Sequence, residues 1–439
     1  MRTTRTGLPY GDGVDSRLVI GSLRSALVVL RSTYNGSERG GGGWYHELER
    51  PDPGVTATAV GLLVFDICHD RNEHFRDALT FLAASQIQSD DPLLDGGWST
   101  KSSHGRPVIE ATAWVARMIG TVRCQLTDGA PDAARALKWM VANQNPDGGW
   151  GSLRGCPSRV WLTCIALHGI DLLDPVHPAI EAGIGWLMEA QRMLSGGWGV
   201  DKSATTPAVS QTAMALIVLA ELRGGQHSAA VRRGYDWLIG ELERERRTEG
   251  LGARLEMYNA PCGPDGAPAR LLLWQYGVPT AISALLRHPD APPLGLVVRL
   301  LGKVLSTQTP EGHWGKPQDE PGISLWGVWW CAQALCDLER VPLARAGDVV
   351  VPLAEALVVK RESARAKQLS DLLPRRPRLD LGALLARYWA GLLLVLCVLA
   401  GLLAVRSAVI EWPDFALGLA FPLVLFAAQE FRRHRPGRP

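Results

Sequence analysis

The sequence predicts an all-α fold: a six-repeat α/α toroid, which is a double ring of helices, followed by a C-terminal two-helix transmembrane hairpin. Three observations predict it. A turn of glycines followed by tryptophan recurs before residue 340, helical segments flank each turn, and two long apolar stretches lie near the C-terminus. Because a repeated helix pair buries its apolar face only against its neighbours, we expect the pairs to assemble into one body.

The recurring turn is clearest at residues 144–150, which read QNPDGGW. Further versions end at Trp44, Trp98, Trp198 and Trp314. Glycine allows the backbone to turn sharply where a helix ends, so each turn should separate two helices of one unit. The turn is therefore structural.

The helices that precede the turns are predicted as half-exposed members of an outer ring. Several carry apolar residues at three-to-four spacing with charges between them, as half-exposed helices do. The six predicted segments are residues 17–31, 75–88, 132–143, 179–192, 229–246 and 294–307.

The helices that follow the turns are more apolar and are predicted as the inner ring. Residues 210–219, for example, are apolar nearly all round, and helices of that kind are buried. A threonine recurs at one position in most of these helices and allows close helix packing. The six predicted segments are residues 55–68, 108–119, 159–170, 209–222, 271–286 and 324–338.

The fifth unit departs from the pattern. Residues 249–253 (EGLGA) replace the tryptophan turn, and residues 258–269 form an insertion rich in proline and glycine. An altered repeat is typical of a mouth or binding edge, and simple decay of the repeat explains it equally well.

The C-terminal region is predicted to enter a membrane. Residues 388–405 contain no charge in eighteen positions, enough for about 27 Å of helix, and residues 415–428 form a second apolar segment. Arginines flank the pair on both outer sides, which predicts that both termini and the toroid face the cytoplasm. The alternative is that one or both segments are buried helices of the ring.

The predicted domains follow from these elements. They are an N-terminal extension (1–16), the toroid (17–340), a helical and basic linker (341–380), the transmembrane hairpin (381–431) and a basic tail (432–439).

Charge and cysteine content exclude several classes. Residues 360–439 hold 13 Lys and Arg against 6 Asp and Glu, whereas the preceding residues hold 33 against 38. The toroid thus has no basic excess for nucleic acid, and the basic tail suits an anionic lipid surface. The eight cysteines show no close pairing, so we expect reduced thiols and neither a zinc ribbon nor a disulfide framework.

The turns at residues 144–150 and 308–314 (QTPEGHW) resemble the QW repeats of the squalene-hopene cyclase and protein prenyltransferase β-subunit superfamily. The start of an inner helix at residues 210–213 (SQTA) is similar to the same family, and the resemblance covers residues 17–338. It implies an apolar cavity for an isoprenoid inside the inner ring, with chemistry at the inner-helix N-termini. The single toroid and the membrane hairpin depart from the squalene cyclases, which have two toroids.

Glu110 is the candidate catalytic acid. Class II cyclases of this family carry Asp-x-Asp-Asp before Thr-Ala, and their middle aspartate protonates the substrate. Residues 108–113 (VIEATA) place Glu110 in the middle, with Val108 and Ala111 at the other two acid positions. The alternative role for Glu110 is a charge or hydrogen-bonding group at the mouth. Three cationic side chains precede Glu110 in the sequence: Lys101, His104 and Arg106. We expect them to favour the ionised form of Glu110.

Aligned inner helices give the candidate ligand-binding residues. An indole face attracts a cation, so tryptophans near the first turns could stabilise a carbocation. Packing explains them equally well, since a buried tryptophan removes roughly 150–250 Å² from water, an upper bound of about 4–6 kcal/mol. The positions aligned with Glu110 are Thr56, Trp161, Ser210, Val278 and Trp329. Three further tryptophans lie near them in the sequence: Trp114, Trp326 and Trp330.

We expect no metal site and no cofactor. The acidic run at residues 90–95 (DDPLLD) superficially resembles a motif that binds magnesium diphosphate, but its proline and the glycines that follow predict a turn. A second cluster lies at the far end of an inner helix, where a solvated helix terminus is the simpler interpretation. It comprises Asp66, Cys68, His69, Asp70 and His74.

The sequence therefore predicts a membrane-anchored toroid that holds an isoprenoid or lipid-like ligand in its central cavity. Whether it cyclises or transfers that ligand stays open at this point. The alternative is a non-catalytic toroid acting as a sensor, scaffold or membrane effector. Predicted partners are the lipid or isoprenoid molecule and, through the hairpin, the bilayer; nucleic acid is not expected, and a protein partner stays open.

Overall fold

The computed structural model describes residues 16–341, except 38–39, 71, 101–102, 104, 127–128, 193–194, 223–228, 245–249, 262–267, 291 and 316–321. For residues 16–17, 254–261 and 268–274 it gives the backbone only. The chain divides into two compact units, Met1–Lys360 and Arg361–Pro439. The predicted linker, transmembrane hairpin and basic tail lie outside the described residues. No helix within the described ranges has the length and apolar character needed to cross a bilayer.

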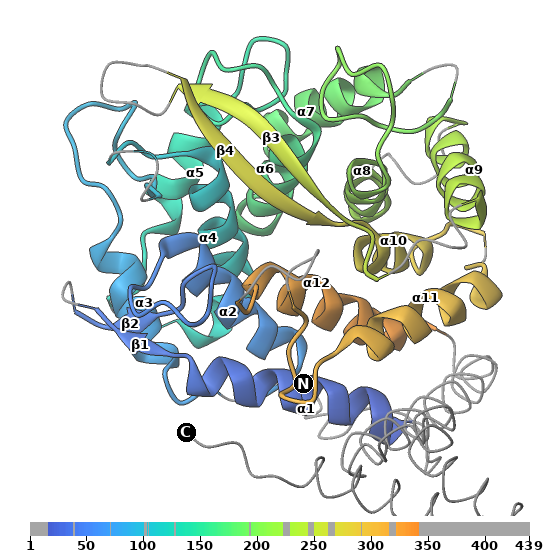
Figure 1. Cartoon of the computed structure of the whole chain (residues 1–439). Helices are drawn as coiled ribbons and strands as arrows, with labels where there is room; N and C mark the ends of the chain where they lie inside the picture. The colour runs from blue at the N-terminus through green and yellow to red at the C-terminus, as the bar shows by residue number, and fades with distance from the viewer. Residues whose placement is uncertain are drawn as a thin grey trace, which may run out of the picture. The chain divides into compact units, whose positions relative to one another are not determined.

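Six helices of the described chain form an inner ring. Each packs against the next in chain order, and the last packs against the first, which closes the ring (Figure 1). The inner helices are buried almost all round, as their apolar composition predicts. They are α2 (Val55–Ile67), α4 (Ile109–Thr121), α6 (Val160–Leu173), α8 (Val209–Glu221), α10 (Gly277–Leu285) and α12 (Leu325–Cys336).

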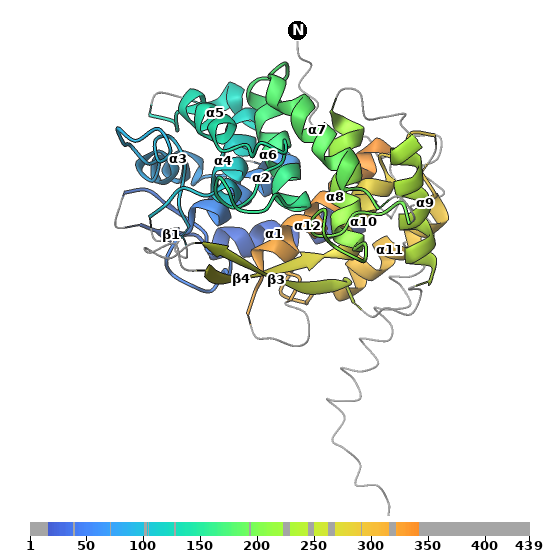
Figure 2. The same ribbon diagram turned by 90° about the horizontal axis from the view of Figure 1, so that it is seen from above.

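Six half-exposed helices surround this ring, and each packs against the inner helix of the preceding unit, in some cases also against that of its own unit (Figure 2). The double ring of six helix pairs predicted from the repeats is therefore confirmed for the described part of the chain, which is mostly helical; a β-hairpin departs from the predicted all-α class. The outer helices are α1 (Ser16–Ser32), α3 (Phe75–Ala84), α5 (Ala133–Ala142), α7 (Pro178–Ala190), α9 (Ala229–Arg244) and α11 (Leu294–Thr307).

The tryptophan of each turn joins the two helices of its unit. The Trp150 indole Nε1 donates to the Met140 carbonyl at the end of α5 (2.9 Å), and the Trp150 backbone N–H donates to Thr163 Oγ1 on α6 (3.1 Å). The indole is fully buried. The same two bonds recur at three further turns, those of Trp44, Trp98 and Trp198.

A glutamine precedes four of the five turns and joins one unit to the next. Gln144 Nε2 donates to the Gly148 carbonyl within its own turn (2.8 Å) and to the Ala179 carbonyl of the next outer helix (3.0 Å). Gln308 makes the equivalent bonds to Gly312 and, across the closure of the ring, to the Ser22 carbonyl (2.9 Å). The repeated motif thus supplies both the bonds within units and the bond that closes the ring.

Gly148 gives a direct test of the turn. It has φ +90°, and a Cβ there would lie 2.5 Å from the Ala182 carbonyl oxygen of α7. Gly155 has a similar φ of +83° with open space around it. We expect Gly148→Ala to lower the free energy of unfolding by about 2–4 kcal/mol through backbone strain plus the clash, and Gly155→Ala by about 1 kcal/mol through strain alone. Equal losses in urea denaturation would contradict the close packing of this turn.

The fifth unit contains an antiparallel hairpin, β3 (Ala253–Pro261) and β4 (Pro268–Tyr276), where the prediction had an insertion followed by helix. The predicted inner helix at 271–286 was therefore wrong in its first six residues, because α10 begins at Gly277. A short apolar run such as residues 271–274 is compatible with a strand as well as with a helix. Here the pairing with β3 makes it a strand. The hairpin directly precedes α10 in the chain and lies over one face of the ring (Figures 1 and 2).

The described structure also contains four short elements. A two-residue ladder pairs β1 (Asn35–Gly36) with β2 (Gly42–Gly43) around the first turn. Two 3-10 helices follow inner helices, η2 (Arg123–Gln125) after α4 and η4 (Asp337–Arg340) after α12.

Candidate functional site

Glu110 is the second residue of α4 and lies on the face of that helix that is turned into the ring. Trp114 and Arg117 follow it by four and seven residues, which puts all three side chains on one face. Trp114 packs against Trp326 and Trp329 of α12, so this face is directed inward. Part of the Glu110 side chain stays accessible although the residue lies deep in the protein.

Burial raises the pKa of Glu110 from its ordinary value of 4.5 to about 7. Among the described residues no cation contributes to this shift. Our expectation that upstream cations favour the ionised form is wrong for Arg106, whose side chain is exposed; Lys101 and His104 lie outside the described residues. At neutral pH, Glu110 is therefore protonated in a large fraction of molecules, as a proton donor must be.

The other predicted first-turn residues occupy equivalent places around the ring. Four of the five are the second residue of their inner helices, and all five are at least nine-tenths buried. The alignment was wrong for α12, where the second residue is Trp326 and Trp329 lies three positions further on. The remaining equivalents are Thr56 on α2, Trp161 on α6, Ser210 on α8 and Val278 on α10.

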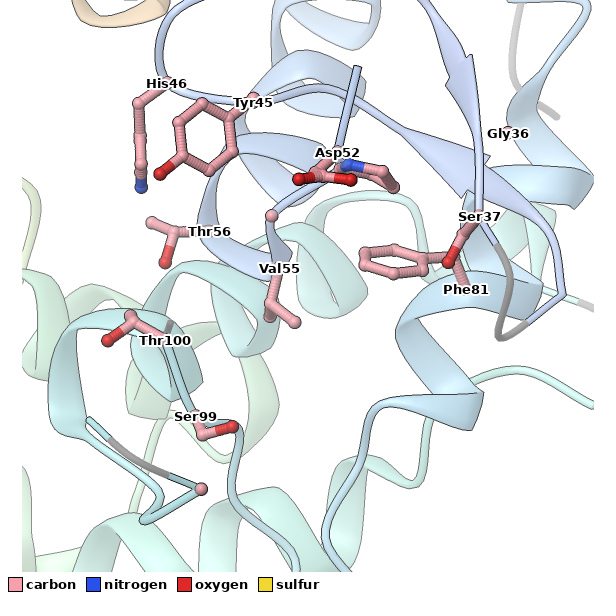
Figure 3. A pocket seen from close by; sticks show the side chains of 13 residues that line it. Gly36, Ser37, Tyr45, His46, Asp52, Val55, Thr56, Phe81, Ser99 and Thr100 are labelled. Atoms are coloured by element: carbon pink, nitrogen blue, oxygen red, sulfur yellow. The ribbon is translucent and has the colours of Figure 1, made fainter. Parts of the chain in front are cut away.

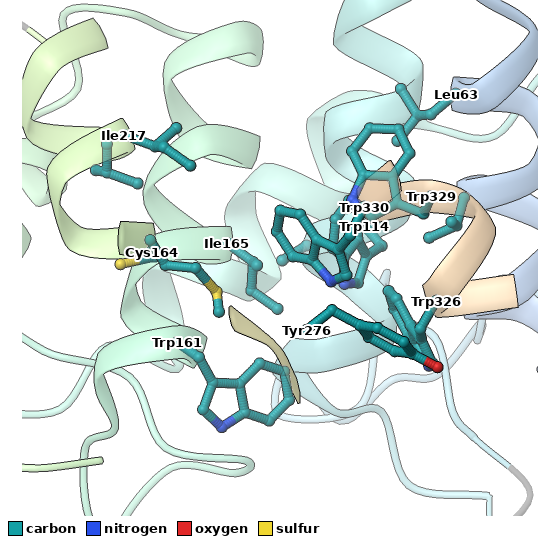
Figure 4. Close-up of a cluster of buried hydrophobic side chains, with 14 of the residues drawn as sticks. Leu63, Trp114, Trp161, Cys164, Ile165, Ile217, Tyr276, Trp326, Trp329 and Trp330 are labelled. Atoms are coloured by element: carbon teal, nitrogen blue, oxygen red, sulfur yellow. The ribbon is translucent and has the colours of Figure 1, made fainter. Parts of the chain in front are cut away.

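Four of the predicted tryptophans form one cluster. The ring centroids of Trp114 and Trp326 are 5.5 Å apart, those of Trp114 and Trp329 are 5.4 Å apart, and those of Trp329 and Trp330 are 6.1 Å apart. Trp161 approaches from α6 on the other side of the view (Figure 4). Trp114 presents the aromatic surface nearest along its helix to Glu110, one turn away.

Arg117 lies against this cluster. Its guanidinium carbon is 5.3 Å from the ring centroid of Trp114 and 5.2 Å from that of Trp329, so two indole faces hold one cation. Burial lowers the pKa of Arg117 to about 10, which leaves the group charged at neutral pH.

A partly buried network of ion pairs joins the C-terminal ends of several inner helices. Arg287, after α10, makes two bonds to Asp337 (2.7 and 3.1 Å) and one to Glu221 at the end of α8 (2.7 Å). Arg340 also contacts Glu221 and Asp337, and His168 Nε2 of α6 lies 3.2 Å from Glu221. We call these five residues the floor network.

The floor network holds its charges firmly. Burial raises the pKa of Glu221, but the nearby imidazole of His168 and the charge of Arg287 outweigh burial and keep that pKa well below its usual range. Burial lowers the pKa of Arg287, and its two carboxylate partners more than reverse this. Burial lowers the pKa of His168, so that imidazole is neutral at pH 7.

A small pocket lies within the inner ring beside this network. We call it the floor pocket; its volume is about 20 Å³, and its lining comes from α4, α6, α8 and α12 and from the end of α10. Its polar lining residues are Arg117, His168, Ser283, Arg287 and Gln333.

The alignment of units contained a signal for this pocket that we did not use. Arg117, His168 and Gln333 each follow the first-turn position of their helix by seven residues, which is two turns along the same face. Three polar residues at one position of otherwise apolar helices indicate a polar layer inside the ring.

A larger pocket of about 590 Å³ opens beside the N-terminus of α2 (Figure 3). We call it the mouth pocket. Thr56, Tyr45 and His46 lie on one side of it, with Ser99 and Thr100 opposite.

His46 connects the mouth pocket to the tryptophan cluster. Its ring stacks on Trp326 at a centroid distance of 5.6 Å, and burial lowers its pKa to about 4, so it is neutral at pH 7. His46 Nδ1 and Thr56 Oγ1 are buried and have no hydrogen-bond partner among the described residues. This pocket offers uncharged polar groups and the acidic side chain of Asp52 to a ligand.

Two other sequence candidates are accounted for by local structure. Asp91 caps its own turn by accepting from the Leu93 N–H, and Asp95 pairs with Arg135 of the next outer helix. The acidic run is therefore a turn, as predicted.

The residues that follow α2 have separate partners. Asp70 pairs with Arg31 (2.9 Å), His74 stacks on Tyr34, and Cys68 Sγ lies 4.0 Å from Cys336 Sγ. Within the described ranges no group of three such side chains is placed to hold a metal ion.

Comparison with known proteins bears on this geometry. Residues 105–252 match the family model of the squalene-hopene cyclase C-terminal domain. The chain is similar to a squalene-hopene cyclase of Zymomonas mobilis, at 29% identity over 151 residues, 32% of this chain and 22% of that protein. It is also similar to a chloroplastic bifunctional diterpene synthase of Selaginella moellendorffii, at 29% identity over 126 residues, 27% of this chain and 13% of that protein. This chain thus spans less than a quarter of the length of either relative.

A solved structure with a similar course of the chain is a variant of the type II terpene cyclase MstE from Scytonema in complex with geranylgeranyl dihydroxybenzoate. It is 15% identical, has a TM-score of 0.45, and the match covers 74% of this chain and 97% of that one. The family model and the cyclase relatives confirm the resemblance that the tryptophan turns indicated.

Proposed function

We propose that this member of the squalene-hopene cyclase and prenyltransferase-like superfamily holds an isoprenoid inside its inner ring and cyclises it by protonation, with Glu110 as the acid. The observation that carries this proposal is the state of Glu110. It is the residue of the VIEATA segment that matches the family's acid, its face is turned into the ring, and burial raises its pKa to about 7. A carboxylic acid kept neutral in a water-poor place suits proton transfer to a carbon–carbon double bond.

The proposed reaction needs no oxidant and no leaving group. The Glu110 proton adds to one carbon of a double bond, and the other carbon becomes a cation. A second double bond of the same chain attacks that cation, which forms the ring bond. Loss of a proton from the cyclic cation gives an isomer of the substrate and restores the proton balance.

The tryptophan cluster supports this proposal because it lies one turn from Glu110. Aromatic faces stabilise a passing cation by about 1–2 kcal/mol each when water is excluded. Trp114 presents the first such face, and Trp326 and Trp329 extend it. The indoles also pack the core, and both roles are compatible.

We further propose that residues 381–431 anchor the toroid to a membrane with the ring on the cytoplasmic side. The uncharged stretch at 388–405 and its flanking arginines support this. An anchored ring would take up a water-insoluble substrate directly from the bilayer.

The alternative is a ring that binds a ligand without converting it. The polar lining of the mouth pocket favours this alternative, as does the replacement of the family's other two acids by Val108 and Ala111. The two functions differ in one result: a catalyst makes product, and a binding protein returns its ligand unchanged.

The test is incubation of the full chain in detergent with squalene, farnesyl diphosphate and geranylgeranyl diphosphate, followed by mass spectrometry of the extracts. We expect a new product isomeric with one substrate. Ligand that is retained but unchanged would favour the binding alternative and refute the catalytic proposal.

A further inference from the structure

The floor pocket is lined by a half-buried cation, Arg117, which has no anionic hydrogen-bond partner among the described residues. Within the described residues, no carboxylate or other acceptor lies within hydrogen-bonding distance of the Arg117 guanidinium, which touches two indole faces instead. Its five N–H groups therefore donate to none of the described residues. A buried guanidinium normally has a carboxylate or phosphate opposite it, because leaving the charge unpaired is costly.

The neighbouring charges do not supply that partner. Arg287 and Arg340 are matched by Glu221 and Asp337 through short bonds, and the imidazole of His168 is neutral. Arg117 is thus left with one unmatched positive charge beside the floor network.

A second polar group lines the same pocket unpaired. Ser283 Oγ is fully buried and has no hydrogen-bond partner among the described residues. A hydroxyl can donate to an anion, as can the side-chain amide of Gln333, which also lines the pocket. Arg117, Ser283 and Gln333 together provide donors from three inner helices.

The size of the floor pocket limits what these donors can hold. A volume of about 20 Å³ is little more than the space of one water molecule. A single carboxylate approaches this size, whereas a diphosphate is several times too large. The rest of the lining is mostly apolar, including Ile165, Met214, Ile217 and Trp330.

We infer that the floor pocket binds one carboxylate, the head group of an apolar chain that extends along the inner helices toward Glu110. This inference rests on the proposed function and names its substrate class, an isoprenoid carboxylic acid. Seven residues of α4 separate Arg117 from Glu110, about 10 Å of helix. The double bond that receives the proton should therefore lie about 10 Å from the carboxylate, roughly eight carbons along an extended chain.

The test compares three ligands that share one tail: farnesoic acid, farnesol and farnesyl diphosphate. Their dissociation constants are measured for the full chain in detergent at pH 7 by calorimetry. We expect the acid to bind about 10 to 100 times more tightly than the alcohol, the range that a charge-assisted hydrogen bond provides, and more tightly than the diphosphate.

Variants assign the preference to Arg117. We expect Arg117→Gln to reduce binding of the acid to the level of the alcohol, whereas Arg117→Lys keeps part of the preference. Arg123→Gln is the matched control, because it removes the same charge from an exposed position just after α4. Circular dichroism confirms the fold of each variant, and the ranking of the three ligands on the unaltered chain needs no variant.

Equal binding of acid and alcohol, tighter binding of the diphosphate, or a preference that survives Arg117→Gln would overturn the inference while leaving the proposed function intact. Failure of all three ligands to bind would overturn both.

Discussion

Replacing Glu110 with glutamine is expected to reduce the rate of product formation by at least about 100-fold and by up to about 10,000-fold, the contribution of a positioned general acid. Glutamine has nearly the same shape as protonated glutamate but no proton to give to a carbon. Substrate binding should change little, since the neutral acid and the amide are similar in polarity. Initial rates by mass spectrometry, together with binding constants, separate the two effects.

The matched control is Glu181→Gln, which makes the same change in the first turn of the outer helix α7, where the side chain is exposed. We expect it to leave the rate unchanged. The pH profile adds a second check: the rate of the unaltered protein should fall as pH rises through about 7, because Glu110 then loses its proton. A Glu110→Gln variant that keeps full activity would refute the assigned role.

The raised pKa of Glu110 also predicts that the stability of the protein without substrate depends on pH. Its pKa in the folded protein, about 7, is above its ordinary value of 4.5, so the folded state holds this proton when the unfolded chain has released it. The resulting stability is present at low pH and is lost as pH rises from 4.5 through about 7. Between these pH values the free energy of unfolding of the unaltered protein should fall by at most about 3 kcal/mol because of Glu110. We expect Glu110→Gln to lack this contribution.

Replacing Asp337 with alanine is expected to lower the free energy of unfolding by about 3–5 kcal/mol. The Asp337 side chain is 5% exposed and that of Arg287 is 6% exposed, so the change leaves a buried guanidinium with only Glu221 as its carboxylate. Helices α8, α10 and α12 meet at this network, and the loss should appear as one cooperative transition at lower urea concentration.

A neighbouring acid and a double variant test the cause. Glu339→Ala removes an exposed acid from the same 3-10 helix, and we expect it to cost less than about 1 kcal/mol. Combining Asp337→Leu with Arg287→Met replaces the ion pair with apolar side chains and should recover much of the loss. A double variant no more stable than Asp337→Ala would show that the unpaired charge is not the cause.

The ring itself was predictable because the bonds that define it lie within a short motif. Gln144, Gly148 and Trp150 stand within seven residues, and each makes its contact with the nearest helices in the chain. Repetition of the motif then specifies the assembly. The fifth unit was mispredicted where the motif is missing, because no local residue distinguishes strand from helix in the LLLW run.

The position of Glu110 in the ring was predictable from the alignment of the inner helices. A threonine two residues after Glu110 fixes that alignment for its helix. The same marker is absent from α12, where Val328 stands at the threonine position, and the alignment therefore chose Trp329 in place of Trp326. The floor network was not predicted because its members come from distant parts of the chain. The transmembrane hairpin stays a prediction from its sequence.

The most direct measurement of the central proposal is the reaction in deuterium oxide. If Glu110 starts the cyclisation, its exchangeable proton becomes a deuteron, and that deuteron is added to a carbon of the product. We therefore predict a product one mass unit heavier, with the label retained after the product is returned to ordinary water. A product that carries no deuterium, or no product from any isoprenoid acid, alcohol or diphosphate, would contradict proton-initiated cyclisation by this ring.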